Sequence, residues 1–314
     1  MTSVDPFDIK GTAKLFLREY SENYILRFKK SINKDKTKNM NNLEAYKMDG
    51  LGNDFIIFDK REKPISLSKE QIIKISDRNN IGCDQVIFID KDKSSDAFLK
   101  FYNSDGGEIS ACGNGSRCVA YLLMKENNNK TISLKTKAGI LQAELNDKNL
   151  VSINMGQPNF EWNKIPLSKQ MDNKNLEIKI NSNDGKEIKG GFSLSVGNPH
   201  VIFFVKDINQ FNLEEIGPKI ENHSYFPEKC NVTLASIKNR KHVKVKVWER
   251  GAGLTKACGT AACATAVSSA VLKLSERYVD IEFSEVILNI DWKKDNNIYM
   301  TGMVSEVKKI TVSI

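Results

Sequence analysis

The sequence lacks any apolar run close to the ~20 residues that a membrane-spanning helix needs, and no short apolar secretory segment follows the first methionine. It has three histidines and no cysteines spaced Cys-x-x-Cys, so a structural zinc site is not indicated. Six cysteines in 314 residues are too few for a disulfide scaffold. These absences predict a cytoplasmic protein with reduced thiols, no metal and no membrane span.

Positive charge is in small excess and is unevenly distributed. The net charge is +8, and half of it lies in residues 1–42, which hold nine lysines and arginines against five acidic residues. No aromatic-rich basic stripe accompanies the charge, so nucleic-acid binding is not supported. A content of 40% apolar residues with only 7 prolines excludes a disordered or fibrous chain. The length suits one large domain or two smaller ones.

An internal repeat decides between these two possibilities. Four pairs of segments recur in the same order at a spacing of 145–147 residues. They are GNDFIIF (52–58) with GNPHVIF (197–203), CDQV (83–86) with CNV (230–232), FYNSDGG (101–107) with VWERGAG (247–253), and ACGN (111–114) with ACGT (257–260). One match alone is weak evidence, but four in order indicate two copies of one domain.

Each copy shows short β-rich runs followed by one clear helix. The strands are expected over 55–58, 86–89, 98–102, 151–153, 201–205 and 243–247. The helices follow each Ala-Cys-Gly and are apolar nearly all round, which is typical of a helix buried among strands. The predicted fold is therefore α+β, with two duplicated domains, each a barrel-like sheet around a central helix, and an active site at the domain interface.

The expected domain limits follow from the repeat. The first domain is expected over 43–155 and the second over 156–302, with 303–314 returning to the first. Residues 1–42 are an extension. Within it, aromatic residues spaced four apart predict an amphipathic helix over 15–32, and the alternative is a disordered leader before a start at Met40.

Two cysteines stand at the expected helix N-termini, Cys112 and Cys258, each followed by glycine. The free N–H groups and the dipole of a helix N-terminus favour an anion, so the thiol pKa values are expected to be lowered. The same amides are expected to bind a carboxylate. The residues that supply them are Gly113, Asn114, Gly259 and Thr260.

Such a matched pair suits inversion at a carbon. One thiolate removes a proton from one face, and the other thiol protonates the opposite face. Either cysteine alone would most simply be a buried core residue, but their equivalent places in two repeats favour a role in chemistry. The other four cysteines have no such pattern and are expected to pack in the core. They are Cys83, Cys118, Cys230 and Cys263.

At this point the sequence resembles the diaminopimelate epimerase family from about residue 43 to the C-terminus. The motifs that carry the resemblance are MDGLGNDF (48–55), NNIGCDQ (79–85), FYNSDGGE (101–108), ACGNGSRC (111–118), GNPH (197–200) and WERGAGLTKACGTAAC (248–263). The resemblance implies an isomerase that interconverts LL- and meso-diaminopimelate in lysine and peptidoglycan precursor synthesis. It implies no cofactor, a small-molecule substrate and compatibility with a homodimer.

The resemblance also implies residue roles. Cys112 and Cys258 become the acid/base pair, assisted by His200 and Glu249, while Glu249 and Arg250 engage the distal end of the substrate. The amides of Gly113, Asn114, Gly259 and Thr260 hold the carboxylate. The remaining pocket residues are Asn53, Gln85, Asn103, Asn198 and Asn231.

The sequence departs from the family pattern at three places: Leu254 where glutamate is common, Ala261 where glycine is common, and Gly302-Met303-Val304 in place of Gly-Pro-Ala. None of these removes an expected base or ligand. Two other functions stay open. One is a related cofactor-independent racemase of the proline or hydroxyproline type, which the Glu249-Arg250 pair disfavours. The other is a thiol-based redox or binding protein in which Cys112 and Cys258 form a disulfide.

Overall fold

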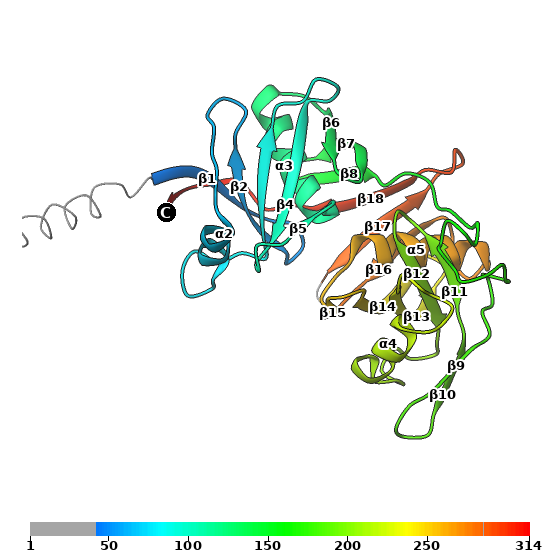
Figure 1. Cartoon of the computed structure of the whole chain (residues 1–314). Helices are drawn as coiled ribbons and strands as arrows, with labels where there is room; N and C mark the ends of the chain where they lie inside the picture. The colour runs from blue at the N-terminus through cyan, green and yellow to red at the C-terminus, as the bar shows by residue number, and fades with distance from the viewer. Residues whose placement is uncertain (1–41, 285) are drawn as a thin grey trace, which may run out of the picture. The chain divides into compact units, whose positions relative to one another are not determined.

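The order of helices and strands repeats along the chain (Figure 1). The first half contains β1 (Asn42–Asp49), β2 (Asp54–Asp59), α2 (Lys69–Ser76), β3 (Gln85–Asp90), β4 (Ala97–Asn103), β5 (Glu108–Ile109), α3 (Gly113–Asn127), β6 (Thr131–Thr136), β7 (Gly139–Asp147) and β8 (Leu150–Asn154). After the hairpin of β9 (Ile178–Asn181) and β10 (Glu187–Gly190), the second half contains β11 (Phe192–Ser195), β12 (Pro199–Phe204), α4 (Leu213–Glu221), β13 (Asn231–Asn239), β14 (His242–Glu249), β15 (Gly253–Thr255), α5 (Gly259–Val271), β16 (Tyr278–Glu282), β17 (Ile287–Trp292) and β18 (Ile298–Met303). β19 (Lys308–Ser313) follows.

The computed structural model describes residues 42–284 and 286–314. Residues 45–310 form one unit, and residues 42–44 and 311–314 belong to another. In the latter, Ser313 Oγ donates a hydrogen bond to Asn42 Oδ1 over 2.8 Å. The helix expected over 15–32 lies outside the described residues. Among the residues that are described, no helix is long and apolar enough to cross a membrane.

The two halves share their strand pairing as well as their element order. β2 and β3 are parallel with Phe55 opposite Gln85, and β12 and β13 are parallel with His200 opposite Asn231. β4 is antiparallel to β3 and parallel to β6, just as β14 is antiparallel to β13 and parallel to β16. Each parallel pair needs a crossover, and the helices α2, α3, α4 and α5 lie in these crossovers.

The two halves join through equivalent strands. β8 pairs antiparallel with β18, with Ser152 opposite Thr301. The hydroxyl oxygens of these two residues are 2.6 Å apart. Because equivalent strands of the two repeats pair antiparallel, an approximate two-fold axis relates the halves near this residue pair.

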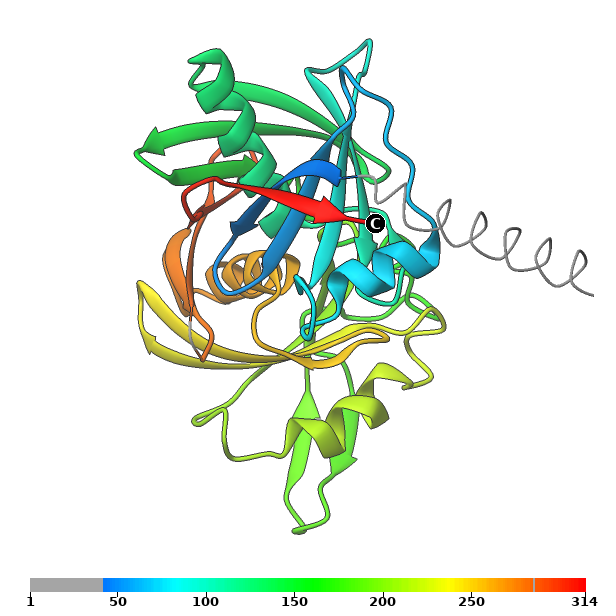
Figure 2. The same cartoon turned by 90° about the vertical axis from the view of Figure 1, so that its left-hand side faces the viewer.

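Each half has its own core, built around one helix. In α3 every residue from Cys118 to Met124 is buried, and these side chains pack with those of the first-half strands. In α5 every residue from Ala261 to Ser269 is buried, and the apolar ones pack with the second-half strands. Figure 2 shows α5 between the yellow and orange strands of its half. The predicted α+β fold of two repeated sheet-rich domains, each around a central helix, is confirmed.

After β18 the chain contacts the first half again. Val304 belongs to the first-half core, and its N–H donates to Asn149 O over 2.9 Å. Ser305 N donates to Asp49 O over 2.7 Å, and Asp49 N donates to Ser305 Oγ over 2.8 Å. The two halves are therefore connected by this segment as well as by β8 and β18.

Candidate active site

The two Gly-rich motifs begin equivalent helices in the same backbone conformation. Cys112 is the N-cap of α3 with φ −141° and ψ 115°, and Cys258 is the N-cap of α5 with φ −137° and ψ 118°. Cys112 Sγ accepts a hydrogen bond from Gly115 N over 3.4 Å. Cys258 Sγ lies 3.4 Å from Thr260 Oγ1. The predicted position of both cysteines at helix N-termini is confirmed.

One methionine side chain lies against both helix starts. A Cβ atom added to Gly113 would be 2.8 Å from Met300 Cε, and a Cβ atom added to Gly259 would be 2.8 Å from Met300 Sδ. Met300 belongs to β18 and is fully buried. Glycine leaves room for Met300 on both sides, so the glycines after the two cysteines let both helix N-termini lie against this one side chain.

Both thiols have raised pKa values, so the expected lowering is wrong. Burial raises the pKa of Cys112 to about 11, although the Gly115 N–H and the charge of Arg117 lower it. Burial also raises the pKa of Cys258 well above its ordinary value, and the Glu249 carboxylate adds to this. Removing a thiolate from water costs more free energy here than is gained from the favourable interaction of the thiolate with the helix N-terminus. In the free protein both thiols are therefore protonated at neutral pH.

Glu249, the last residue of β14, is the acidic group beside the thiols. Its negative charge raises the pKa of both Cys112 and Cys258, and it shares a hydrogen bond with the Cys258 thiol. Thr255 Oγ1 donates to Glu249 Oε1 over 2.5 Å, which fixes the carboxylate. A carboxylate held in a partly buried site is suited to pair with an ammonium group.

The turn that carries Glu249 and Arg250 is hydrogen-bonded to α4. Glu221, a buried residue of that helix, accepts from Trp248 Nε1 over 2.7 Å and from Gly251 N over 3.0 Å. Asn231 Oδ1 accepts from Arg250 N over 3.0 Å. The Arg250 side chain itself is exposed and donates to Glu228 O over 3.0 Å.

In the first half, Asn53 is the predicted pocket residue that touches a thiol. Cys112 Sγ is 3.8 Å from Asn53 Oδ1. Asn53 Nδ2 donates to Asp84 Oδ2 over 2.8 Å, so the amide oxygen is the atom turned toward the sulfur. Arg78 Nη2 in turn donates to Asp84 Oδ1 over 2.5 Å. Sequence reasoning missed Asp84, although it precedes the predicted Gln85.

Arg78 also links this group to Asp54. Its two Nη atoms donate to the two carboxylate oxygens of Asp54 over 2.8 Å each, and Lys47 Nζ donates to Asp54 Oδ2 over 2.6 Å. Burial alone raises the pKa of Asp54, but the hydrogen bonds from Arg78 and Lys47 outweigh it and lower the pKa from 3.8 to about 2. The ion-pair cluster therefore stabilises the charged carboxylate in the folded protein.

This shift predicts an acid-dependent loss of stability at Asp54. The folded pKa lies below the unfolded one, so the contribution is complete above pH 3.8 and is lost as the pH falls toward about 2. We expect the urea midpoint of the wild-type protein to exceed that of Asp54→Asn by a constant amount above about pH 5. The difference should shrink toward zero near pH 2. A difference that stays constant across this range would contradict the assignment.

In the second half, a row of polar contacts connects His200 to Cys258. Burial, and then the charge of Arg250, lower the pKa of His200 to about 3, so its ring is neutral. His200 Nε2 lies 2.9 Å from Asn198 Oδ1 and donates to it. Asn198 Nδ2 lies 3.4 Å from Thr260 Oγ1, which is beside the Cys258 thiol. His200 thus orients an amide rather than carrying a charge.

Gln85 and Asn103 form a further polar pair on adjacent strands. Gln85 Nε2 donates to Asn103 Oδ1 over 3.0 Å. Gln85 Oε1 is buried and has no hydrogen-bond partner among the described residues. In the repeat, Asn103 occupies the position of Glu249. A buried acceptor of this kind is suited to a donor group on a ligand.

The remaining cysteines pack in the cores, as predicted. Cys83, Cys118, Cys230 and Cys263 are all buried, and all six cysteines are free thiols. Across the described ranges, no three His, Cys, Asp or Glu side chains are grouped so as to hold a metal ion.

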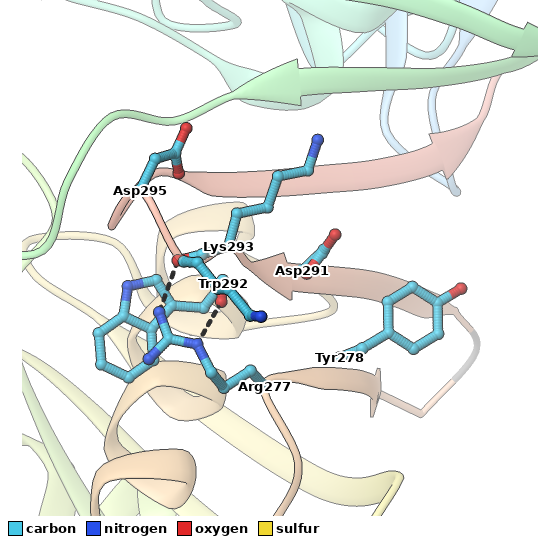
Figure 3. A pocket seen from close by; sticks show the side chains of 7 residues that line it. Arg277, Tyr278, Asp291, Trp292, Lys293 and Asp295 are labelled. Carbon is cyan, nitrogen blue, oxygen red and sulfur yellow. Dashed lines mark hydrogen bonds between the residues drawn. The ribbon is translucent and has the colours of Figure 1, made fainter.

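Two surface pockets are lined by other residues. The first, of about 530 Å³, is formed by Arg277, Tyr278 and residues 291–295 (Figure 3). Its Arg277 donates to Trp292 O and Lys293 O over 2.6 Å each, and its guanidinium lies 3.6 Å from the centroid of the Trp292 ring. The second pocket, of about 450 Å³, is lined by residues 160–163, 170, 171 and 173. Neither pocket contains a residue predicted for the active site.

Several solved structures share this fold at low sequence identity. A phenazine biosynthesis protein of the PhzF family from Bacillus anthracis matches with a TM-score of 0.61 and 17% identity, over 88% of this chain and 100% of that chain. A hydroxyproline epimerase from Agrobacterium vitis, with bound trans-4-hydroxy-L-proline, matches with a TM-score of 0.59 and 12% identity, over 87% of this chain and 93% of that chain. The chain thus has the duplicated fold of this class of proteins.

Sequence comparison assigns the family within that class. The model of the diaminopimelate epimerase family matches residues 45–161 and 192–307, one block in each half. The chain is 54% identical over 272 residues to the diaminopimelate epimerase of Pelagibacter ubique strain HTCC1062, covering 87% of this chain and 99% of that protein. It is 42% identical over 270 residues to that of Caulobacter sp. strain K31, covering 82% and 93%. The chain belongs to the diaminopimelate epimerase family.

Proposed function

We propose that this protein interconverts LL- and meso-diaminopimelate, as a step in lysine and peptidoglycan precursor synthesis, with no cofactor. The observation that carries the proposal is the matched pair of N-cap cysteines, each followed by a glycine that lies against Met300, together with the Glu249 charge that acts on both thiols. Family membership supports the substrate, and the paired thiols support inversion at a carbon that carries an amino and a carboxylate group.

Binding of the carboxylate starts the reaction. The backbone N–H groups at the starts of α3 and α5 are suited to hold it, and we assign this role to Gly113, Asn114, Gly259 and Thr260. When the α-proton leaves, negative charge moves onto the carboxylate oxygens. Preorganised N–H donors in a site with little water stabilise that charge more than they stabilise the ground state, so they lower the barrier.

Proton transfer then uses the two sulfur atoms in turn. One thiolate takes the α-proton, so the Cα–H bond breaks and an S–H bond forms. The opposite thiol gives its proton to the other face of the carbon, so its S–H bond breaks and a new Cα–H bond forms. The two cysteines exchange protonation states, and the reverse reaction uses them in the opposite order.

Substrate binding supplies the thiolate that this scheme needs. Glu249 raises the pKa of both thiols in the free protein. A substrate ammonium paired with Glu249 cancels this negative charge and brings a positive charge near the sulfur atoms, so the thiol pKa values fall on binding. One of the two thiols then ionises and its proton is released to solvent water, while the other stays protonated. His200 assists by fixing Asn198 and Thr260 beside Cys258.

The other predicted residues are assigned to the rest of the substrate. Arg250 is suited to grip a carboxylate with two parallel hydrogen bonds. The remaining amide side chains supply donors and acceptors for the distal amino-acid group, and the unpaired Gln85 Oε1 accepts from its ammonium. The amides in question are Asn53, Gln85, Asn103, Asn198 and Asn231.

We also propose that the repeated domains span 43–155 and 156–302, with 303–314 returning to the first, and that the protein works in the cytoplasm. The contacts of Val304 and Ser305 with the first half support the domain limits. The six free cysteines support a reducing compartment.

Deuterium incorporation tests the proposed reaction. The purified, reduced protein in D₂O should exchange the α-hydrogen of LL- and meso-diaminopimelate and bring the two to one equilibrium mixture. Because the proton added comes from the second thiol, the inverted product should carry deuterium from its first turnover. Proline and trans-4-hydroxyproline serve as comparison substrates. Exchange with these and not with diaminopimelate would refute the proposal in favour of a proline-type racemase.

A further inference from the structure

Arg117, in the second turn of α3, is the largest of the fully buried side chains. Its Nη2 donates to Asn114 Oδ1 over 2.7 Å. Its Nε and Nη1 atoms have no hydrogen-bond partner in the part of the chain that is described. An arginine stays protonated even when buried, so this is a positive charge inside the protein with one of its donor atoms hydrogen-bonded. Within residues 42–284 and 286–314, no carboxylate forms an ion pair with it.

The guanidinium lies where the two halves meet. A Cβ atom added to Gly302, at the end of β18, would be 3.1 Å from both Cζ and Nε of Arg117. Its charge interacts electrostatically with the thiol of Cys118 in the same helix, with that of the N-cap Cys112, and with that of Cys263 on α5. A side chain at position 302 would therefore press on both the guanidinium and Leu51 Cδ1, which is 2.8 Å from the same Cβ position.

The repeat explains why one arginine occupies this place. At the spacing of 146, the position equivalent to Arg117 is Cys263. α3 and α5 are in contact, so two arginines at these positions would put two buried positive charges together. The small, neutral Cys263 leaves room for a single guanidinium at the interface of the two repeats.

A buried charge without a partner lowers the stability of the folded protein, so the presence of Arg117 points to an anion that it stabilises. The negative charge of Asp49 acts on Cys118 and that of Glu249 acts on Cys112, and neither of these carboxylates is hydrogen-bonded to the arginine. The anions that form near Arg117 during the proposed reaction are the thiolate of Cys112 and the charge on the bound carboxylate. Arg117 lowers the pKa of Cys112 against the effect of burial.

We propose that Arg117 is a positioning residue that acts as the fixed counter-charge of the active site. It orients Asn114 at the start of α3 and places a permanent positive charge behind Cys112. This inference rests on the proposed function for its effect on turnover, but its effect on the Cys112 thiol is independent of any substrate.

The test compares Arg117→Met, which keeps most of the volume and removes the charge, with Arg117→Lys, which keeps the charge. Two measurements are made: epimerase turnover, and the rate of iodoacetamide alkylation of Cys112 between pH 7 and pH 9, followed by mass spectrometry of its peptide. We expect Cys112 to be alkylated about tenfold more slowly in Arg117→Met than in the wild type, because the pKa of the Cys112 thiol rises by about one unit. The kcat/KM of Arg117→Met should fall about 10²-fold or more.

In Arg117→Lys, Cys112 should be alkylated at a rate within about threefold of the wild-type rate, because lysine keeps a positive charge at this position. Cys263→Ala, which changes the facing position on α5, is the control and should keep both rates. Arg117→Met with unchanged alkylation of Cys112 would overturn the proposal, as would a lysine variant as slow as the methionine variant. If Arg117→Met does not fold, Gly302→Ala, which displaces the guanidinium, is used instead with the same expectation. Absence of wild-type turnover would refute the proposed function, while the alkylation rates would still decide the role of Arg117.

Discussion

Replacement of either Cys112 or Cys258 by alanine is expected to abolish conversion of LL- to meso-diaminopimelate, with a loss of turnover of about 10⁴-fold. Each variant removes the N-cap thiol of one helix, α3 or α5, and leaves the equivalent thiol of the other helix in place. A single remaining base can still remove a proton from one face of the carbon. We therefore expect each variant to exchange the α-hydrogen of one isomer with D₂O without inverting it, and the two variants to prefer opposite isomers.

The measurement is proton NMR of each isomer in D₂O, with chromatographic separation of the isomers. Cys83→Ala is the control, since Cys83 is a buried free thiol of the first half that contacts Ser76 and no residue assigned to the active site. Its turnover should match the wild type within a small factor once the folded fraction is equal. Inversion by either active-site variant at near-normal rate would rule out the two-thiol scheme.

Much of the architecture could be predicted from the sequence because it depends on local patterns. All six predicted β-rich runs fall on strands of the repeated sheets, and the helices begin directly after the Ala-Cys-Gly motifs. The repeat of 145–147 residues predicts that Cys112 and Cys258 are equivalent, and their N-cap backbone angles agree within a few degrees. Spacing, apolar periodicity and turn residues carry this information directly.

The thiol pKa values could not be predicted in the same way. A helix N-terminus is visible in the sequence, so a lowered pKa was the natural expectation for Cys112 and Cys258. Burial depends on what the rest of the chain places around the sulfur, and here Met300, from a distant strand, lies against the glycine that follows each cysteine. The desolvation that results is larger than the helix contribution and reverses the sign.

The supporting residues were also beyond sequence reasoning. Asp84 fixes Asn53 through a hydrogen bond between residues 31 apart in the sequence. Glu221 holds the turn of Glu249 through a hydrogen bond between residues 30 apart. Alone, each is an ordinary acidic residue near a turn or a helix end. Arg117 stands inside a quoted motif, yet nothing in that motif shows that its guanidinium is fully buried. Such roles come from tertiary contacts, which no local pattern encodes.

The duplicated fold places unlike residues at equivalent positions, and the site depends on these differences. Asn103 occupies in the first half the position that Glu249 occupies in the second. A single carboxylate, that of Glu249, therefore raises the pKa of both thiols. A symmetric pair of glutamates would raise both thiol pKa values further and would need two ammonium groups to neutralise them. The single charge matches the single α-ammonium of an amino acid.

Glu249→Gln should therefore change two measurements in opposite directions. Loss of the carboxylate removes the partner of the substrate ammonium, so kcat/KM should fall about 10²–10³-fold. The same change removes the negative charge that raises the pKa of Cys112 and Cys258, so both thiols should be alkylated faster than in the wild type between pH 7 and pH 9. Glutamine still accepts from Thr255 Oγ1, which keeps the turn in place.

A fall in kcat/KM together with faster alkylation separates an electrostatic role of Glu249 from simple loss of structure. A damaged fold would lower turnover, but it would not produce a matched, pH-dependent increase in the thiolate fraction of both cysteines. Glu282→Gln is the control: this carboxylate pairs with His242 and Lys244 and should leave turnover and both alkylation rates unchanged. Turnover lost in Glu249→Gln with alkylation no faster than in the wild type would mean that Glu249 binds substrate without holding the thiols protonated. In that case the thiolate would have to arise without charge neutralisation at Glu249, and the coupling of substrate binding to thiol ionisation would be wrong.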